Sequence, residues 1–362
     1  MVAVARAVAA RWPAGSRLML VADNADWVID YEMRHLAGIA RALGIRLANR
    51  RFLNASENQA AFFGSQFGLL RRDATLPPHA VATAYFHGRP GTEGSPEFDD
   101  CYEALQRLHE GIARVQVTHD EMRELVVSAG VEPARVHTIR IGVDLDAFRL
   151  RTSSERDAAR QALGVPADAF AVGSFQKDGV GWGEGLEPKL IKGPDLLVAA
   201  LELARDRIPE LFVVLSGPAR GYVRAALDRM EIPYVHRLVR RHDALRALYV
   251  ASDVVAVSSR QEGGPKAVLE AMAVGVPVVS TRVGQAQELI DGTNGHLVDV
   301  GDVDGLAAAI AAAAEVTAGQ IAAARTTAEA NAYAAQLPLW SALFEGMVVP
   351  AGRRRREVPR LS

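Results

Sequence analysis

The chain is nearly free of cysteine and lysine, and neither sign of charge predominates. Its one cysteine among 362 residues, Cys101, excludes an internal disulfide and any zinc site built from several cysteines. The 41 Lys and Arg residues are balanced by 43 Asp and Glu residues, for a net charge of −2. This balance gives no electrostatic reason to expect a nucleic-acid partner, and the lack of cysteine suits a reducing compartment.

Long hydrophobic runs are also lacking. The longest run of small apolar residues, Leu306–Ala314, is too short to span a bilayer, and Arg6 and Arg11 interrupt the apolar N-terminal stretch as no signal peptide would allow. We therefore expect a cytoplasmic protein. Contact of the arginine run Arg353–Arg356 with anionic lipid would place the protein peripherally at the inner face of a membrane. Charged termini are, however, more often simply solvated.

Strand-like and helix-like segments alternate along most of the chain. Apolar strands are expected at 17–23, 45–53, 80–87, 114–119, 135–141, 169–175, 211–216, 234–239, 253–258, 276–281 and 296–298. Helical patterns lie between them, among them 27–43, 57–70, 98–112 and 121–129. Such alternation predicts an α/β protein with parallel sheets covered on both faces. A polar stretch near residue 150 divides it into two doubly wound, Rossmann-like domains, 1–150 and 151–330, facing each other across a cleft.

The few lysines are concentrated in two loops. Lys177, Lys189 and Lys192 share one glycine-rich loop, Lys266 lies in another, and the remaining 37 basic residues are arginines. Each loop leads into a helix through a proline, which suits a first helical position. The free N–H groups at a helix start favour an anion such as phosphate, so the two loops predict phosphate-binding sites.

Two glutamates flank the second of these loops. Glu262 precedes the Gly263–Gly264–Pro265–Lys266 turn, and Glu270 follows it within the helix. Two solvated glutamates on a capped surface helix would be the ordinary interpretation of such a pair. The glycine-rich turn between them favours a phosphate flanked by two hydroxyl-bearing rings, as in a nucleotide sugar.

The segment from Glu262 to Ser280, EGGPKAVLEAMAVGVPVVS, resembles the E-x7-E segment of the retaining family 4 (group 1) glycosyltransferases. Further resemblances follow in family order: AYFHG at 84–88, IGVDLDAF at 141–148 and Lys192–Gly193. The resemblance covers about residues 80–300. It implies a GT-B fold with an N-terminal acceptor-binding domain and a C-terminal nucleotide-sugar-binding domain. It also implies that a helix within 331–349 packs back on the N-terminal domain, before a basic tail at 350–362.

The resemblance also assigns roles within the C-terminal domain. Lys192 and Glu262 are expected to act on the departing diphosphate and the donor sugar, and Glu270 on the ribose. Relatives usually have an arginine after the strand expected here at 169–175, and Lys177 takes its place. An exchange of roles between Lys177 and Lys189 is the alternative interpretation. The remaining donor-binding candidates are Gly217, Arg220, His236, Gly263, Gly264, Pro265 and Lys266. A plain strand-to-helix turn is an equally good interpretation of Gly217–Arg220.

Candidates in the N-terminal half concern the sugar and the acceptor. By resemblance, His87 at a strand end contacts the donor sugar or the transferred group. Asp23, Asn24 and Trp27 replace the glycine-rich loop that many relatives have there, and a carboxylate, an amide and an aromatic face suit a sugar acceptor. Because the sequence 23–27 departs from that glycine-rich loop, there is less reason to expect a phosphorylated acceptor.

The sequence thus predicts a retaining glycosyltransferase that uses a nucleoside-diphosphate sugar as co-substrate, with no cofactor and no metal. The expected acceptor is a sugar, a lipid-linked molecule or a small molecule, in cell-surface polysaccharide or glycolipid biosynthesis. Two alternatives stay open: a GT-B nucleotide-sugar epimerase, and a sugar-nucleotide-binding protein without catalysis. A dehydrogenase is disfavoured because neither half has G-x-G-x-x-G after its first strand.

Overall fold

The computed structural model describes residues 17–22, 28–49, 59–77, 79–239 and 241–348. The chain forms two compact units, one of residues 1–140 with 333–362 and the other of residues 141–332. This division falls ten residues before the boundary that we predicted after residue 150. The reason is local packing: Val143 and Phe148 belong to the hydrophobic core of the second unit, and the Ile141 amide donates to Gln285 Oε1 at 2.9 Å.

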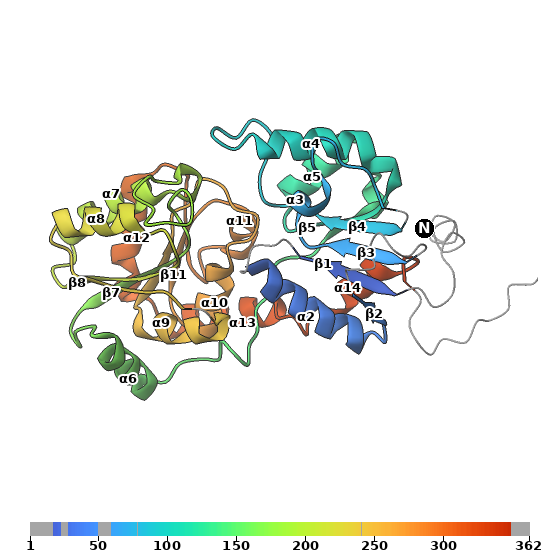
Figure 1. Cartoon of the computed structure of the whole chain (residues 1–362). Helices are drawn as coiled ribbons and strands as arrows, with labels where there is room; N and C mark the ends of the chain where they lie inside the picture. Colours follow the sequence, from blue (N-terminus) through green and yellow to red (C-terminus); the bar gives the residue numbers. More distant parts are fainter. Residues whose placement is uncertain (1–16, 23–27, 50–58, 78, 240, 349–362) are drawn as a thin grey trace, which may run out of the picture. The chain divides into compact units, whose positions relative to one another are not determined.

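The first unit is built on a six-stranded parallel sheet (Figure 1). Its strands lie in the order β2 (Leu47–Ala48), β1 (Leu18–Val21), β3 (Ala60–Phe63), β4 (Ala80–Ala84), β5 (Ile112–Val117) and β6 (Val136–Thr138). Every residue of β3 and β4 is buried. Burial on both faces is what their unbroken apolar runs predict, because helices cover a parallel sheet on both sides.

The helices of the first unit lie on both faces of its sheet. Among the described residues of this unit they are α2 (Val28–Ala42), α3 (Gln66–Leu69), α4 (Glu97–Leu108), α5 (Asp120–Ser128) and α14 (Leu337–Phe344). The last of these returns from the far end of the sequence. Its Trp340 and Phe344 rings pack edge-on against Phe62 of β3, with centroids 5.3 and 6.3 Å away.

Our predicted helix at 57–70 is wrong in its central part. Ala60–Phe63 forms the central strand β3, and only Gln66–Leu69 is helical, with Ser65 Oγ accepting the Phe67 amide as its N-cap. Alanine favours helices in isolation. Here the AAFF run pairs with β1 on one side and β4 on the other, and tertiary context overrides local preference.

The second unit is built on another six-stranded parallel sheet. Its order is β12 (His296–Val298), β11 (Val278–Thr281), β10 (Val254–Val257), β7 (Phe170–Phe175), β8 (Leu211–Ser216) and β9 (Tyr234–Arg237). Numbered from β7, this is the 3-2-1-4-5-6 order of dinucleotide-binding folds. The strand order reverses between β7 and β10, and ligands of such sheets bind outside the carboxyl ends of the strands at that point.

Helices cover both faces of this sheet too. One core joins the sheet to α7 (Pro194–Arg205), α8 (Gly221–Arg229) and α12 (Val303–Ala312). The opposite core includes α9 (Arg246–Ala251), α10 (Lys266–Val274) and α13 (Ala318–Ala330). The remaining helices are α6 (Ser153–Leu163) and α11 (Ala286–Leu289). Across the described residues no single helix has the length and apolarity to cross a bilayer; one bent pair, Val303–Glu315 with Ala318–Ala330, meets these two criteria.

Candidate functional site

Two helix starts meet where the order of the second sheet reverses. Helix α7 follows the loop after β7, and α10 follows the loop after β10. The loops are joined by hydrogen bonds: Ser258 Oγ donates to Gly193 O at 2.8 Å, and the Arg260 amide donates to Ile191 O at 2.9 Å. The two lysine-bearing loops predicted from the sequence therefore lie together, at the place where the fold favours a ligand.

Gly193 makes this close approach possible. It caps α7 with φ +60°, a left-handed conformation that favours glycine. A Cβ atom at this position would lie 1.9 Å from Ser258 O, well inside van der Waals contact. Pro194 occupies the first turn of α7, as predicted.

Lys192 and Glu262 form an ion pair at the junction of the two loops. Lys192 Nζ lies 2.6 Å from Glu262 Oε1, with 27% and 15% of the two side chains exposed. Ser259 Oγ donates to the same Glu262 oxygen at 3.0 Å, and Gln176 Nε2 donates to Lys192 O at 3.0 Å. Both charged groups are thus held in place while keeping some access to solvent, as binding of an external charged ligand requires.

The Gly263–Lys266 turn leads into α10. The helix begins at Lys266, so Pro265 lies one residue before the first helical position that we predicted for it. Gly263 O accepts the Gln285 amide at 3.0 Å. The Lys266 side chain is largely buried, and its Nζ donates to Gly142 O at 3.1 Å. Lys266 is therefore directed toward the backbone at the start of the second unit, not toward open solvent.

Glu270 is more enclosed than the sequence suggested. Its side chain is 3% exposed; Oε1 lies 2.5 Å from His242 Nε2, and Oε2 accepts the Tyr249 hydroxyl at 2.6 Å. Burial acts to raise its pKa, but His242, Lys266 and Tyr249 outweigh burial and lower it. Glu270 is thus an ionised buried carboxylate with both oxygens in use, and its contact with a ribose stays a prediction.

Arg220 was one of the donor-binding candidates, with a plain strand-to-helix turn as an equally good interpretation. Its side chain is fully buried, and Nε lies 2.9 Å from Asp178 Oδ1, itself fully buried. Its Nη1 also donates to Ser174 O and Ser216 O, both at 2.8 Å. Arg220 is committed to this network, and its guanidinium has no exposed surface for a ligand.

A hairpin inserted after β7 closes the neighbouring helix start. This segment, the Trp182 hairpin (residues 178–189), is paired through an antiparallel bridge between Gly179 and Pro188. Its Glu184 and Gly185 carbonyls accept the amides of Gly221 and Tyr222, each at 2.8 Å. These are the first amides of α8, so the chain itself already occupies that helix start.

Lys177, Gly217 and His236 lie around the base of the hairpin. Lys177 Nζ lies 4.2 Å from the centre of the Trp182 ring, and burial, followed by the nearby Lys189, lowers the pKa of Lys177. Gly217 has φ +107°, and its carbonyl lies 2.8 Å from His236 Nε2. Burial lowers the pKa of His236 in spite of that hydrogen bond.

His87 lies three residues beyond β4 in the first unit. Gln66 Oε1 accepts both the Phe86 and His87 amides at 3.0 Å, and this contact fixes the backbone at the strand end. The His87 ring stacks on Phe67 with centroids 5.3 Å apart. The predicted acceptor residues Asp23, Asn24 and Trp27 lie outside the described residues, as does the arginine tail.

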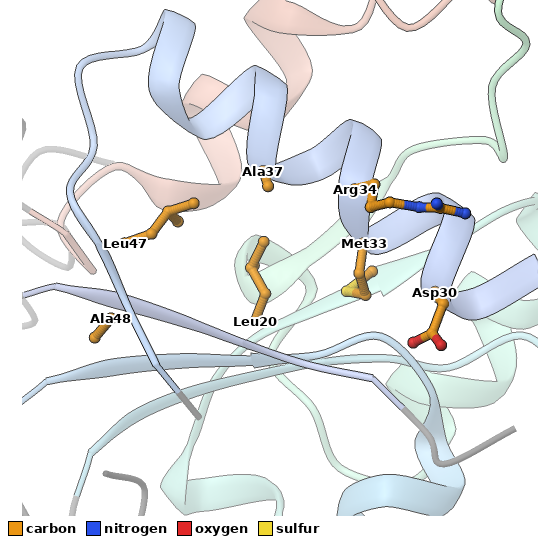
Figure 2. A pocket seen from close by; sticks show the side chains of 7 residues that line it. All are labelled: Leu20, Asp30, Met33, Arg34, Ala37, Leu47 and Ala48. Atoms are coloured by element: carbon orange, nitrogen blue, oxygen red, sulfur yellow. The ribbon is translucent and has the colours of Figure 1, made fainter. Parts of the chain in front are cut away.

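The first unit also contains a hollow of about 460 Å³ beside α2. Figure 2 shows Asp30, Met33 and Arg34 on this helix and Leu20 on β1. The rest of the lining is Ala37, Leu47 and Ala48. Most of these side chains are apolar, so the hollow has few groups that would orient a polar ligand.

Sequence reasoning missed several residues of the second unit that bond to the predicted site residues. Asp178, Ser259, His242 and Tyr249 were not singled out, although each is bonded to a predicted residue. Ser259 and Asp178 carried a usable signal, because both follow strands that flank the reversal of strand order. His242 and Tyr249 gave none, because they come from a different loop and helix. Within the described residues, no three His, Cys, Asp or Glu side chains gather as a metal site would require.

Comparison with known proteins places this geometry in a structural class. Residues 184–315 match the family model described as "Glycosyl transferases group 1". Anabaena HepE, solved with UDP and glucose, superposes with a TM-score of 0.70 over 91% of this chain and 98% of that one, at 19% identity. Sucrose-phosphate synthase from Thermosynechococcus elongatus gives 0.69 with the same coverage and identity. The chain therefore has the GT-B fold of two Rossmann-like domains.

Curated relatives extend the similarity at the sequence level. The chain is 36% identical over 230 residues to D-inositol 3-phosphate glycosyltransferase 2 of Catenulispora acidiphila, covering 59% of this chain and 49% of that protein. It is 33% identical over 273 residues to D-inositol 3-phosphate glycosyltransferase of Kribbella flavida, covering 70% of this chain and 61% of that protein. The matches thus span about half to three-fifths of these relatives.

Proposed function

We propose that the chain is a retaining glycosyltransferase that moves a sugar from a nucleoside-diphosphate sugar to an acceptor. The Lys192–Glu262 pair carries this proposal. It joins a cation and a carboxylate between two helix starts, at the reversal of strand order in the second sheet. The group 1 match over residues 184–315 includes both residues and supports the same chemistry.

The pair divides into two roles when a donor binds. Lys192 turns from Glu262 toward the diphosphate, where its charge and the nearby helix starts stabilise a leaving group that gains negative charge. Glu262 then accepts hydrogen bonds from sugar hydroxyls, still supported by Ser259. Lysine and helix N–H groups supply the positive charge in this scheme, so we propose that no metal is needed.

Retention follows from the direction of attack. The bond between the anomeric carbon and the phosphate oxygen breaks, and its electron pair leaves with the diphosphate. The acceptor oxygen bonds to the same face of the sugar, and its proton passes to the departing phosphate. The E-x7-E resemblance supports this course. His87 stays a predicted contact of the transferred sugar.

The acceptor is proposed more broadly, as a sugar, a lipid-linked molecule or a small molecule. The HepE structure contains UDP and glucose, and the two relatives carry the name D-inositol 3-phosphate glycosyltransferase. These names favour a hydroxyl-rich ring. A role in cell-surface polysaccharide or glycolipid biosynthesis fits such an acceptor.

Donor turnover tests the proposal. Nucleoside diphosphate release would be measured for the full chain with a panel of nucleotide sugars, with and without candidate acceptor sugars. Lys192→Met should lower kcat by about 10²-fold or more, as loss of one group that stabilises developing charge does elsewhere. Glu262→Gln should lower turnover as well.

Glu202→Gln is the matched control, because Glu202 is exposed on α7 and should leave turnover unchanged. Wild-type turnover in both site variants would refute the assignment. An isomerised nucleotide sugar formed without acceptor would instead indicate an epimerase, and binding without any turnover would indicate a protein without catalysis.

A further inference from the structure

Gln285 is a buried amide between the Gly263–Lys266 turn and the start of the second unit. The residue is 0% exposed and lies just before α11. Its carbonyl accepts the Glu288 and Leu289 amides at 3.2 and 3.1 Å, which anchors its backbone to α11. A buried side-chain amide needs partners for its donor and its acceptor, because an unpaired polar group is costly inside a protein. The partners of Gln285 therefore show what it holds in place.

Both polar atoms of the Gln285 side chain bond to the backbone of one residue. The Ile141 amide donates to Gln285 Oε1 at 2.9 Å, and Gln285 Nε2 donates to Ile141 O at 3.2 Å. Reversing the amide would set donor against donor and acceptor against acceptor, so this pair of bonds fixes its orientation. Gln285 thus clasps the first residue of the second unit, which lies 144 residues away in the sequence.

The backbone beside this clasp carries the Glu262 turn (residues 262–264). The Gln285 backbone amide donates to Gly263 O at 3.0 Å. The preceding Gly284 has φ +49°, and a Cβ atom on it would lie 2.3 Å from Glu262 O. A Cβ atom on Gly264 would lie 2.8 Å from both Gln285 Oε1 and the Ile141 side chain. The turn therefore packs on the clasp so closely that no side chain fits between them.

The position of Glu262 depends on this packing. Its carboxylate is held by Lys192 and Ser259, but in the transfer scheme Lys192 leaves it for the diphosphate. Ser259 and the packed backbone of the turn then remain to fix the carboxylate. A displacement of about 1 Å in a group that acts on the substrate can cost about 10²-fold in rate. The clasp thus lies where it bears on turnover.

Lys192 is anchored separately from Gln285. It belongs to the loop between β7 and α7, and its carbonyl accepts Gln176 Nε2 at 3.0 Å. The diphosphate contact proposed for Lys192 therefore does not pass through the clasp. This separation allows an effect on the sugar to be measured apart from an effect on the diphosphate.

We propose that Gln285 is a positioning residue for sugar transfer, which holds the Glu262 turn on the backbone of Ile141 so that the Glu262 carboxylate meets the donor sugar. This inference rests on the proposed function. It includes no contact between Gln285 and the substrate, because both polar atoms of the buried side chain are bonded within the chain.

Turnover of a nucleotide sugar and calorimetric binding of the nucleoside diphosphate, both with the full chain, test this role. Gln285→Met keeps the length of the side chain without its hydrogen bonds, and Gln285→Asn keeps the amide but is one methylene too short. Each should lower kcat at least about tenfold, because the Glu262 turn loses its support. Each should change the Kd of the nucleoside diphosphate by less than about threefold, because Lys192 stays anchored.

Asn294→Leu is the matched control for the loss of a buried amide. Asn294 is 5% exposed, and its Nδ2 donates to Leu289 O at 2.7 Å and to Thr327 Oγ1 at 3.0 Å. This variant should lower the midpoint of thermal unfolding as the Gln285 variants do, yet keep kcat within about twofold of wild type.

The outcomes separate this inference from the proposed function. Wild-type turnover with unchanged kcat in both Gln285 variants would overturn the positioning role alone. So would a loss of kcat no larger than that of Asn294→Leu, or an equal loss of diphosphate affinity, because either would indicate a purely structural clasp. A wild-type chain that turns over no nucleotide sugar would overturn both proposals.

Discussion

Individual residues at the reversal of strand order show how charge is organised around a candidate phosphate site. Lys192 and Glu262 neutralise each other and keep partial exposure, whereas Arg220 and Asp178 neutralise each other in full burial. Only the first pair can exchange its partner for a ligand without leaving an unpaired charge inside the protein. Burial therefore separates two pairs that look alike in the sequence.

A half-buried histidine in the first unit is expected to make stability depend on pH. His137 of β6 has its pKa lowered from 6.5 to about 4, first by burial and then by Arg114 and Arg123. The folded state therefore favours the neutral ring. Below pH 6.5 the His137 imidazole is protonated in the unfolded chain but stays neutral in the folded chain, which favours unfolding. The contribution of His137 to the free energy of unfolding is therefore fully present above pH 6.5 and is lost as the pH falls toward 4.

Urea unfolding at pH 7 and pH 4.5 measures this contribution. His137→Gln has no titrating group, so between these two pH values its free energy of unfolding should fall less than that of wild type, by about 1–2 kcal/mol. Equal losses in the two proteins would show that His137 titrates normally in the folded chain.

At the scale of elements, the junction between the β7–α7 loop and the end of β10 shapes the site. Gly193→Ala would place a methyl group 1.9 Å from Ser258 O and force a left-handed backbone on alanine. We expect a stability loss of about 1–3 kcal/mol from the strained backbone alone and weaker nucleotide binding, because the two loops must separate.

Gly183→Ala is the matched comparison for this change. Gly183 lies in the same long loop but has open space around it and no left-handed backbone angle. The two alanine variants would be compared by thermal unfolding and by nucleoside diphosphate titration. Identical behaviour of Gly183→Ala and Gly193→Ala would contradict the close approach of the loops.

Elements were predictable where local and tertiary preferences agree. Strands β7 to β12 and the start of α7 at Pro194 follow from apolar runs and turn residues. The AAFF strand β3 could not be predicted in this way, because its conformation depends on the partner strands on both of its sides. The enclosure of Glu270 by His242 and Tyr249 was equally hidden, since hydrogen bonds between distant segments leave no periodic signal.

At the scale of the whole molecule, the sequence predicted two Rossmann-like domains, and the structure and its GT-B neighbours confirm them. The order of the second sheet then explains why the two lysine loops converge: they follow β7 and β10, which are adjacent only because the order reverses there. Strand order depends on crossover connections, so the sequence could place lysines in loops but could not show which loops meet.

The central claim is that the second unit binds the diphosphate of a nucleotide sugar through Lys192. Calorimetric titration of the full chain with matched nucleoside diphosphates and monophosphates tests it most directly. We predict saturable binding of one diphosphate, at least about tenfold tighter than the corresponding monophosphate, because the second phosphate gains a charge-assisted contact. Lys192→Met should remove that difference. Equal affinity of the wild-type chain for both nucleotides, or a preference that survives in Lys192→Met, would contradict the account.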